Sequence, residues 1–207
     1  LLNILCGSIP LDGGDVRIDG KSIRKMKDYQ RYATMGRVYQ NPSLGTSPNL
    51  TMLENLSLAD NKGKPFGLGF GVNKKRIDFY RSELAALGLG LEDKLDVKMG
   101  ALSGGQRQAV ALLMATMTPL KFLILDEHTA ALDPKTAETI MVLTGKVVQE
   151  KGLTALMVTH NLRYAVEYGD RLLMLDHGKI VLDRAGEEKA ATSTEELLAI
   201  FNRYSVM

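Results

Sequence analysis

The stretch that decides the fold is LSGGQRQAVALLMATMTPLKFLILDEHTAALDP, which runs from Leu102 to Pro134. It combines a glycine pair at the start of a helical pattern, a continuously apolar run and two adjacent carboxylates. This combination suggests a site for the phosphates of a nucleotide and a metal ion. The loop that ordinarily cradles phosphates, G-x-x-x-x-G-K-[ST], occurs nowhere in the 207 residues.

The composition is that of an ordinary globular chain, with 45% hydrophobic and 24% charged residues. Basic residues number 26 and acidic residues 24, and the two kinds are interspersed, so we expect no nucleic-acid partner. A single cysteine, Cys6, indicates a reducing compartment. No apolar run approaches the roughly 18 to 20 residues that span a bilayer.

Strand patterns alternate with helix patterns along most of the chain. A short strand is predicted at Asp15–Ile18, another ends at Gln40, and TALMVTH (154–160) reads as a buried strand. From Thr51 to Met117 the spacing of apolar residues is helical. The pattern predicts an α/β layered fold with a mainly parallel sheet, into which the helical block is inserted.

The run FLILDE ends in two carboxylates. Continuous apolarity over Phe122–Leu125 predicts a strand buried on both faces, with Asp126 and Glu127 at its carboxyl end, where parallel sheets bind ligands. Asp126 can hold Mg²⁺ directly or through water, and Glu127 can polarise an attacking water. For these two residues alone, the simpler interpretation is that they begin a loop.

The segment LSGGQ (102–106) stands at the start of the helix pattern that precedes this strand. Ser103 and Gln106 have the spacing of a capping box, which by itself is only a well-formed helix start. With the bare backbone of Gly104 and Gly105 and the positive end of the helix dipole, the same segment could bind a phosphate. Two glycines in the first turn cost about 1 kcal/mol each relative to alanine, which favours the functional interpretation.

Three further polar residues stand at element boundaries. Gln40 ends a predicted strand, where its amide could bind Mg²⁺ or the attacking water. His160 follows the strand that begins at Thr154, where an imidazole can contact a terminal phosphate or orient a water. Asp133 precedes Pro134 as the N-cap of the next helix. Each is unremarkable alone, and a lone histidine is more often structural.

Together and in order, these segments resemble the ATP-binding cassette ATPases of ABC transporters. The residues that carry the resemblance are Gln40, LSGGQ at 102–106, FLILDE at 122–127, AALD at 130–133 and His160. The resemblance implies a P-loop NTPase-like (RecA-like) α/β fold, with a mainly parallel sheet flanked by helices. It divides the chain into a partial nucleotide-binding core (1–48), a helical subdomain (49–118) and the rest of the core (119–207).

The resemblance also assigns roles. Glu127 becomes the general base, His160 the switch histidine, and Asp126 a Mg²⁺ residue together with Gln40 of the Q-loop. The signature motif contacts the γ-phosphate of ATP held by the opposite subunit, and Asp133 belongs to the D-loop at that interface. The nucleotide-binding residues implied in this way are Gln40, Ser103, Gly104, Gly105, Gln106 and Asp133.

Partners and place follow from the same resemblance. The implied cofactors are ATP and Mg²⁺, and the implied partners are a membrane permease and a second ATP-binding subunit, head to tail. The segment GEEKAATSTEELLAIF (186–201) resembles a bacterial importer subgroup that works with a substrate-binding protein, at the cytoplasmic face of the cell membrane. The alternatives are a soluble cassette ATPase outside transport, and a non-hydrolysing cassette that only docks to a permease.

The sequence departs from the family pattern in two places. His128 stands after Glu127, where the family usually has proline or alanine, and we interpret it as a residue that packs beside the site rather than a second base. The other departure is the missing Walker A motif, because Leu1 falls where the residue after that motif would be. We therefore expect the N-terminal strands and the P-loop to be missing, and residues 1–207 neither to bind ATP tightly nor to hydrolyse it.

Overall fold

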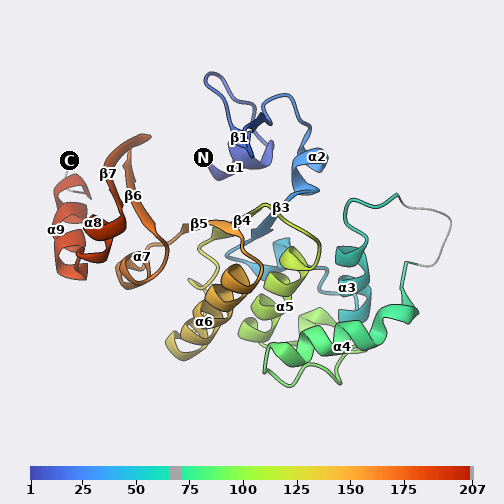
Figure 1. The fold of residues 1–207 in the computed structure, drawn as a ribbon. Helices are drawn as coiled ribbons and strands as arrows, with labels where there is room; N and C mark the ends of the chain where they lie inside the picture. The colour runs from blue at the N-terminus through green and yellow to red at the C-terminus, as the bar shows by residue number, and fades with distance from the viewer. Residues whose placement is uncertain (66–70, 206–207) are drawn as a thin grey trace. The chain divides into compact units, whose positions relative to one another are not determined.

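A computed structural model describes residues 1–65 and 71–205 of the chain. It divides into two compact units, Leu1–Val158 and Thr159–Met207, and each is described here by itself (Figure 1).

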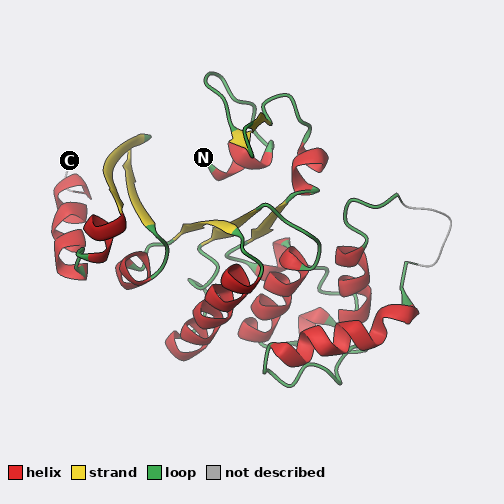
Figure 2. Ribbon diagram, viewed as in Figure 1, coloured by secondary structure: helices red, strands yellow, loops and turns green. Residues whose placement is uncertain are grey.

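The first unit holds the parallel sheet and the two longest helices, α5 and α6 (Figure 2). Its elements are α1 (Leu2–Cys6), β1 (Arg17–Ile18), β2 (Lys21–Ser22), α2 (Asp28–Tyr32), β3 (Met35–Val38), η1 (Pro42–Leu44), α3 (Met52–Asp60), η2 (Lys74–Arg76), α4 (Ile77–Ala86), η3 (Met99–Ala101), α5 (Gly104–Thr116), β4 (Phe122–Asp126), α6 (Pro134–Glu150) and β5 (Thr154–Val158).

The central sheet has the order β3-β4-β5, and both of its pairings are parallel. In the register, Val38 pairs with Leu125, and Leu125 pairs with Met157, so the three strands end at one edge. This confirms the predicted α/β class and the buried strand that carries the two carboxylates. The strand predicted at Asp15–Ile18 forms only as the short β1, paired antiparallel with β2.

Side chains of β3 and β4 point alternately to the two faces of the sheet, and each face packs against a different set of helices. Met35 and Ile124 pack in one cluster with Cys6 of α1. On the other face, Val38, Leu123 and Leu125 pack with Leu112 of α5. Figure 1 shows α1 on one side of the sheet and α5 and α6 on the other.

A buried arginine ties α1 to the segment around α2. Arg31 donates hydrogen bonds to the carbonyl oxygens of Ile4 and Leu5 at the end of α1, at 2.7 and 3.0 Å. The same guanidinium donates to Met26 and Arg24. Helix ends leave such carbonyl groups without partners inside the helix, so Arg31 caps α1 and ties it to the segment around α2.

The helical block forms its own core. Met52 and Leu56 of α3, Tyr80 and Leu84 of α4, and Val110 of α5 are all buried in one cluster. Thr51 begins α3 with a capping box, in which its hydroxyl accepts from the Glu54 N–H. The predicted helical character from Thr51 to Met117 is therefore confirmed for the residues that the structure describes.

The second unit consists of α7 (Leu162–Glu167), β6 (Arg171–Asp176), β7 (Lys179–Ala185), α8 (Gly186–Ala190) and α9 (Thr194–Ser205). Strands β6 and β7 form an antiparallel hairpin, which turns at His177 and Gly178, both with positive φ. Sequence patterns did not predict β2, α2 or α8, because elements of two to five residues carry too little periodicity. Within the described ranges, no helix has the length and apolarity to cross a bilayer.

Candidate functional site

The carboxyl edge of the sheet gathers three of the residues singled out from the sequence. β4 ends at Asp126 with Glu127 next, and Gln40 stands two residues beyond the end of β3. Since Val38 pairs with Leu125, Gln40 and Glu127 leave the sheet at the same edge. Gln40 is exposed, whereas Asp126 and Glu127 are half-buried. His160 is exposed in the second unit and follows β5 along the chain.

The backbone of Glu127 is held in an uncommon conformation. Its φ is 47°, in the left-handed region that residues with a side chain seldom occupy. Its N–H donates to the carbonyl of Val158 at 3.0 Å, and its carbonyl accepts from the N–H of Ala130 at 2.9 Å. These bonds turn the chain sharply out of β4 directly after Asp126.

An arginine that the sequence analysis did not single out is paired with Asp126. Arg37 on β3 donates from Nη2 to Asp126 Oδ2 at 2.6 Å, and from Nη1 to Asn3 Oδ1 at 2.9 Å. Its guanidinium also lies 4.7 Å from the centre of the Tyr39 ring. The sequence did contain a signal for this pair. Arg37 is a single cation inside the strand pattern MGRVYQ (35–40), and a half-buried arginine in a sheet needs an anionic partner.

The donor atoms at this edge fit a magnesium ion. Arg37 occupies Oδ2 of Asp126, which leaves Oδ1 for a cation, and the amide of Gln40 is exposed at the same edge. No group of three or more His, Cys, Asp or Glu side chains that could hold a metal occurs within residues 1–65 and 71–205. Mg²⁺ in nucleotide sites typically uses one or two protein oxygens and takes the rest from phosphates and water. Asp126 and Gln40 would hold it.

His128 is buried, at 2% exposure, and its Nε2 lies 3.0 Å from the hydroxyl of Thr144 on α6. Burial lowers the pKa of this histidine to about 4. The imidazole is therefore neutral near pH 7 and closed off from solvent. His128 therefore packs in the interior next to Asp126 and Glu127, and its exclusion as a second base stays a prediction.

The signature segment forms the predicted helix start. The Ser103 hydroxyl accepts from the Gln106 N–H, and the Gln106 side chain accepts from the Ser103 N–H, both at 3.2 Å. Helix α5 follows from Gly104. Asp133 likewise caps α6, where its carboxylate accepts from the Thr136 N–H at 3.0 Å. Hydrogen bonds from Thr136 lower the pKa of Asp133, so it remains a carboxylate.

The glycine pair has a packing role that the sequence analysis did not foresee. A Cβ placed on Gly105 would lie 2.2 Å from Cγ2 of Thr136, and one on Gly104 would lie 3.4 Å from Cδ2 of Leu132. The start of α5 therefore packs directly against the start of α6 and the residues before it. Close packing alone accounts for glycine at position 105, so its helix cost is no longer an argument for phosphate binding.

Gln108 links the signature helix to the segment after β3, and sequence reasoning missed it. Its side chain is fully buried, and Nε2 donates to the carbonyl oxygen of Tyr39 at 3.0 Å. Tyr39 directly precedes Gln40, so the position of Gln40 is coupled to α5 through this bond. The sequence signal for a buried Gln108 was its position directly before the apolar run AVALL at 109–113.

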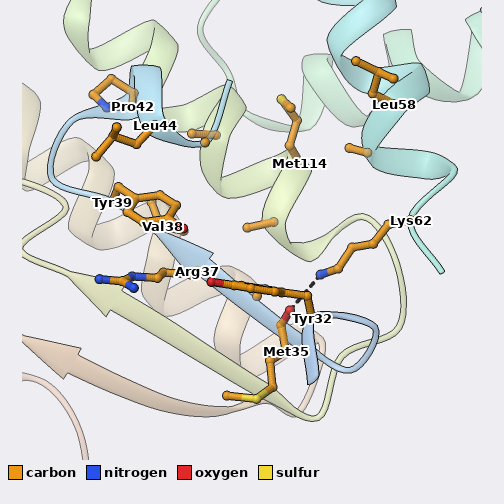
Figure 3. Close-up of a pocket in the computed structure, with 15 residues that line it drawn as sticks. Tyr32, Met35, Arg37, Val38, Tyr39, Pro42, Leu44, Leu58, Lys62 and Met114 are labelled. Atoms are coloured by element: carbon orange, nitrogen blue, oxygen red, sulfur yellow. Dashed lines mark hydrogen bonds between the residues drawn. The ribbon is translucent and has the colours of Figure 1, made fainter. Parts of the chain in front are cut away.

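A groove opens between β3, η1, α3 and α5, with a volume of about 400 Å³. Its walls are mostly apolar and include Leu44, Leu58 and Met114 (Figure 3). At one end, Lys62 donates from Nζ to the carbonyl oxygen of Met35 at 2.7 Å. Burial lowers the pKa of Lys62 to about 8. The groove thus offers a mostly apolar surface that also includes two basic side chains, Arg37 and Lys62.

Comparisons with known proteins agree on one family. The family described as "ABC transporter" matches residues 1–130. The chain is 47% identical over 201 residues to a tyrosine transport ATP-binding protein of Clostridioides difficile, which covers 97% of this chain and 80% of that protein. The chain belongs to the ATP-binding subunits of ABC transporters.

Other relatives of this ATP-binding subunit extend the agreement. A thiamine import ATP-binding protein of Vibrio parahaemolyticus is 36% identical, over 93% of this chain and 76% of its own. A dimeric ATP-binding cassette bound to ADP and phosphate in a post-hydrolysis state aligns with a TM-score of 0.72 at 31% identity, over 89% of this chain and 78% of its own. An ATP-binding cassette of an ABC transporter aligns with a TM-score of 0.77 at 25% identity, over 97% of this chain and 80% of its own.

Family and fold together give the activity. The protein is an ATPase of the ABC type, with the P-loop NTPase fold expected from the sequence. The segments that carried the resemblance lie in the first unit, apart from His160, which stands in the second.

The packing of Gly105 predicts a specific rescue. Gly105→Ala should lower the free energy of unfolding by about 1–3 kcal/mol, because its Cβ would overlap Cγ2 of Thr136. In the double variant Gly105→Ala/Thr136→Ser that methyl group is gone, so most of the stability should return. Chemical denaturation measures both effects.

Gly104→Ala is the matched control, since its Cβ would be in near-ordinary contact, and it should remain close to the parent in stability. Parent-like stability of Gly105→Ala, or no recovery in the double variant, would contradict this account of the packing.

Proposed function

We propose that the protein powers import of a small solute through a membrane permease by hydrolysing MgATP in a head-to-tail dimer. The observation that carries the proposal is that Asp126 and Glu127 stand at the carboxyl end of the buried strand β4, at the same edge of the parallel sheet as Gln40. Relatives named for tyrosine transport and thiamine import support the import of small solutes.

In this proposal, Glu127 is the general base that takes the proton of the attacking water. Its sharp turn at the end of β4 directs the residue away from the sheet, next to Asp126. Asp126 and Gln40 would hold Mg²⁺. When bound, this ion would neutralise negative charge on the phosphate oxygens. Arg37 holds the Asp126 side chain in place by donating a hydrogen bond to Oδ2 at 2.6 Å.

The signature segment acts on the nucleotide of the partner subunit. Ser103, Gly104 and Gly105 stand at the start of the 13-residue helix α5, whose N-terminus favours an anion such as a γ-phosphate. Gln106 supports this end through the capping box, and Asp133 lies at the dimer interface. His160 orients the water or the terminal phosphate. A dimeric relative bound to ADP and phosphate supports this assembly.

The groove between η1, α3 and α5 is the proposed contact with the permease. Its apolar walls suit the apolar face of a helix. They include Tyr39 and Pro42, on either side of Gln40 in the chain, so docking and the nucleotide site share one segment. The proposed subdomains are a nucleotide-binding core (1–48 and 119–207) and a helical subdomain (49–118). Docking would place the protein at the cytoplasmic face of the membrane, with a substrate-binding protein as a further partner of the permease.

Replacing the proposed base tests the catalytic assignment. Glu127→Gln in the complete subunit, assembled with its permease, should lower kcat for ATP hydrolysis by about 10²- to 10⁴-fold, because the amide cannot accept a proton. ATP binding should persist, since the change is isosteric. Phosphate release under saturating MgATP measures the effect, and parent-like turnover would refute the role of Glu127.

The isolated 207 residues should not hydrolyse ATP. They contain no G-x-x-x-x-G-K-[ST] loop, so the backbone amides and lysine that hold the β- and γ-phosphates are missing from them. A nucleotide-binding titration of residues 1–207 should detect no tight binding. Micromolar affinity for ATP in that experiment would overturn the expectation.

The permease contact is tested by a charge placed in the groove. Leu58 lines the groove and is 42% exposed, so Leu58→Asp should leave the fold intact. Docking would bury the new carboxylate away from water, which is costly. Co-purification with the permease should fall about tenfold or more. Leu198→Asp, at a leucine that is 47% exposed on α9, is the matched control and should co-purify normally. Equal recovery of both variants would exclude the groove as the docking site.

A further inference from the structure

His128 directly follows the proposed base, Glu127, and its side chain contacts a different element of the fold, helix α6. Its Nε2 lies 3.0 Å from Oγ1 of Thr144, and both side chains are buried, at 2% and 4% exposure. The Thr144 hydroxyl donates its only proton to the carbonyl of Ile140 at 2.8 Å. Thr144 must therefore accept from His128, which fixes the histidine as the tautomer with its proton on Nε2.

The segment that this bond holds is a conformationally uncommon one. Glu127 has a φ of 47°, and such a conformation persists in a residue with a side chain only where the surroundings enforce it. Two backbone hydrogen bonds, to Val158 and from Ala130, restrain the Glu127 peptide groups. The second of these bonds is made by the carbonyl of the peptide group that joins Glu127 to His128. The side chain of His128 adds a further restraint, to α6.

The anchor for His128 is rigid. Thr144 lies within the 17-residue helix α6, near the buried side chains of Ile140 and Met141. The same helix begins at Pro134, and the carboxylate of the preceding Asp133 caps it. A bond from His128 to α6 therefore ties the chain after Glu127 to a helix that is itself fixed at its start and along its buried face.

We propose that His128 is a positioning residue, which acts through its hydrogen bond to Thr144 to hold Glu127 in the geometry needed to activate water. The inference rests on the proposed role of Glu127 as general base. His128 itself contacts no substrate, because it is buried beneath the turn. General-base catalysis is sensitive to displacements of about 1 Å, so loss of the anchor should reduce the rate of chemistry more than nucleotide binding.

Removal of the Thr144 hydroxyl is the first test, in the complete subunit assembled with its permease. Thr144→Val keeps the shape of the side chain and should lower kcat about tenfold or more, with KM for ATP within about twofold of the parent. Thr144→Ser keeps the hydroxyl and should retain most of the parent kcat.

Thr116→Val is the matched control for a stability effect. Thr116 on α5 is also buried, at 2% exposure, and its hydroxyl likewise donates to a carbonyl of its own helix, that of Leu112 at 2.9 Å. This variant should lose comparable stability in denaturation but keep its kcat. An equal fall of kcat in Thr116→Val and Thr144→Val would show a general stability effect and overturn the proposal.

Variants at position 128 test the same bond from its other end and serve if Thr144→Val does not fold. His128→Leu removes the donor and should show the same selective fall in kcat. His128→Gln offers an amide N–H close to the position of Nε2 and should recover much of it. Equal kcat in His128→Leu and His128→Gln would refute positioning through the hydrogen bond.

Glu127→Gln separates the two levels of inference. If that variant keeps parent turnover, the proposed base is wrong, and the positioning role is wrong with it. If Glu127→Gln is inactive while Thr144→Val and His128→Leu keep the parent kcat, the base stands and only the positioning role of His128 is refuted.

Discussion

The burial of β4 is the constraint on which the rest of the structure depends. Leu123, Ile124 and Leu125 are covered on both faces, so the strand must lie between parallel neighbours and between two layers of helices. An unpaired charge in the buried centre of such a strand would be costly, and Asp126 and Glu127 stand at its end and directly after it. Burial of a hydrophobic run thus determines where the carboxylates can act.

Charge at this edge is organised by two kinds of restraint. Arg37 reaches from β3 to Asp126 and balances a carboxylate that would otherwise be costly in a half-buried position. The backbone of Glu127 is restrained by hydrogen bonds to Val158 and from Ala130, and its neighbour His128 is bonded to Thr144 on α6. The chain on either side of the Asp126–Glu127 pair is thereby tied to different elements of the first unit.

Packing and function share residues in the signature segment. Gly105 allows α5 to approach Thr136 at the start of α6, and Gln108 ties the same helix to Tyr39 next to Gln40. A shift of α5 therefore reaches both the residues around Asp133 and the segment that borders the groove. The helix that carries the signature motif is mechanically linked to the proposed metal site and to the proposed docking surface.

The sequence by itself determined the α/β class, the buried strand ending at Asp126, the capping box at Ser103 and Gln106, the cap at Asp133 and the family. These depend on local periodicity and on motifs that occupy neighbouring positions in the chain. Only the tertiary structure decided the partner of Asp126, the reason for Gly105 and the anchor of His128. Arg37 and Asp126 are far apart in sequence, as are Gly105 and Thr136, and no local pattern encodes which distant side chains meet. Their contacts arise when the parallel sheet and its helices pack together.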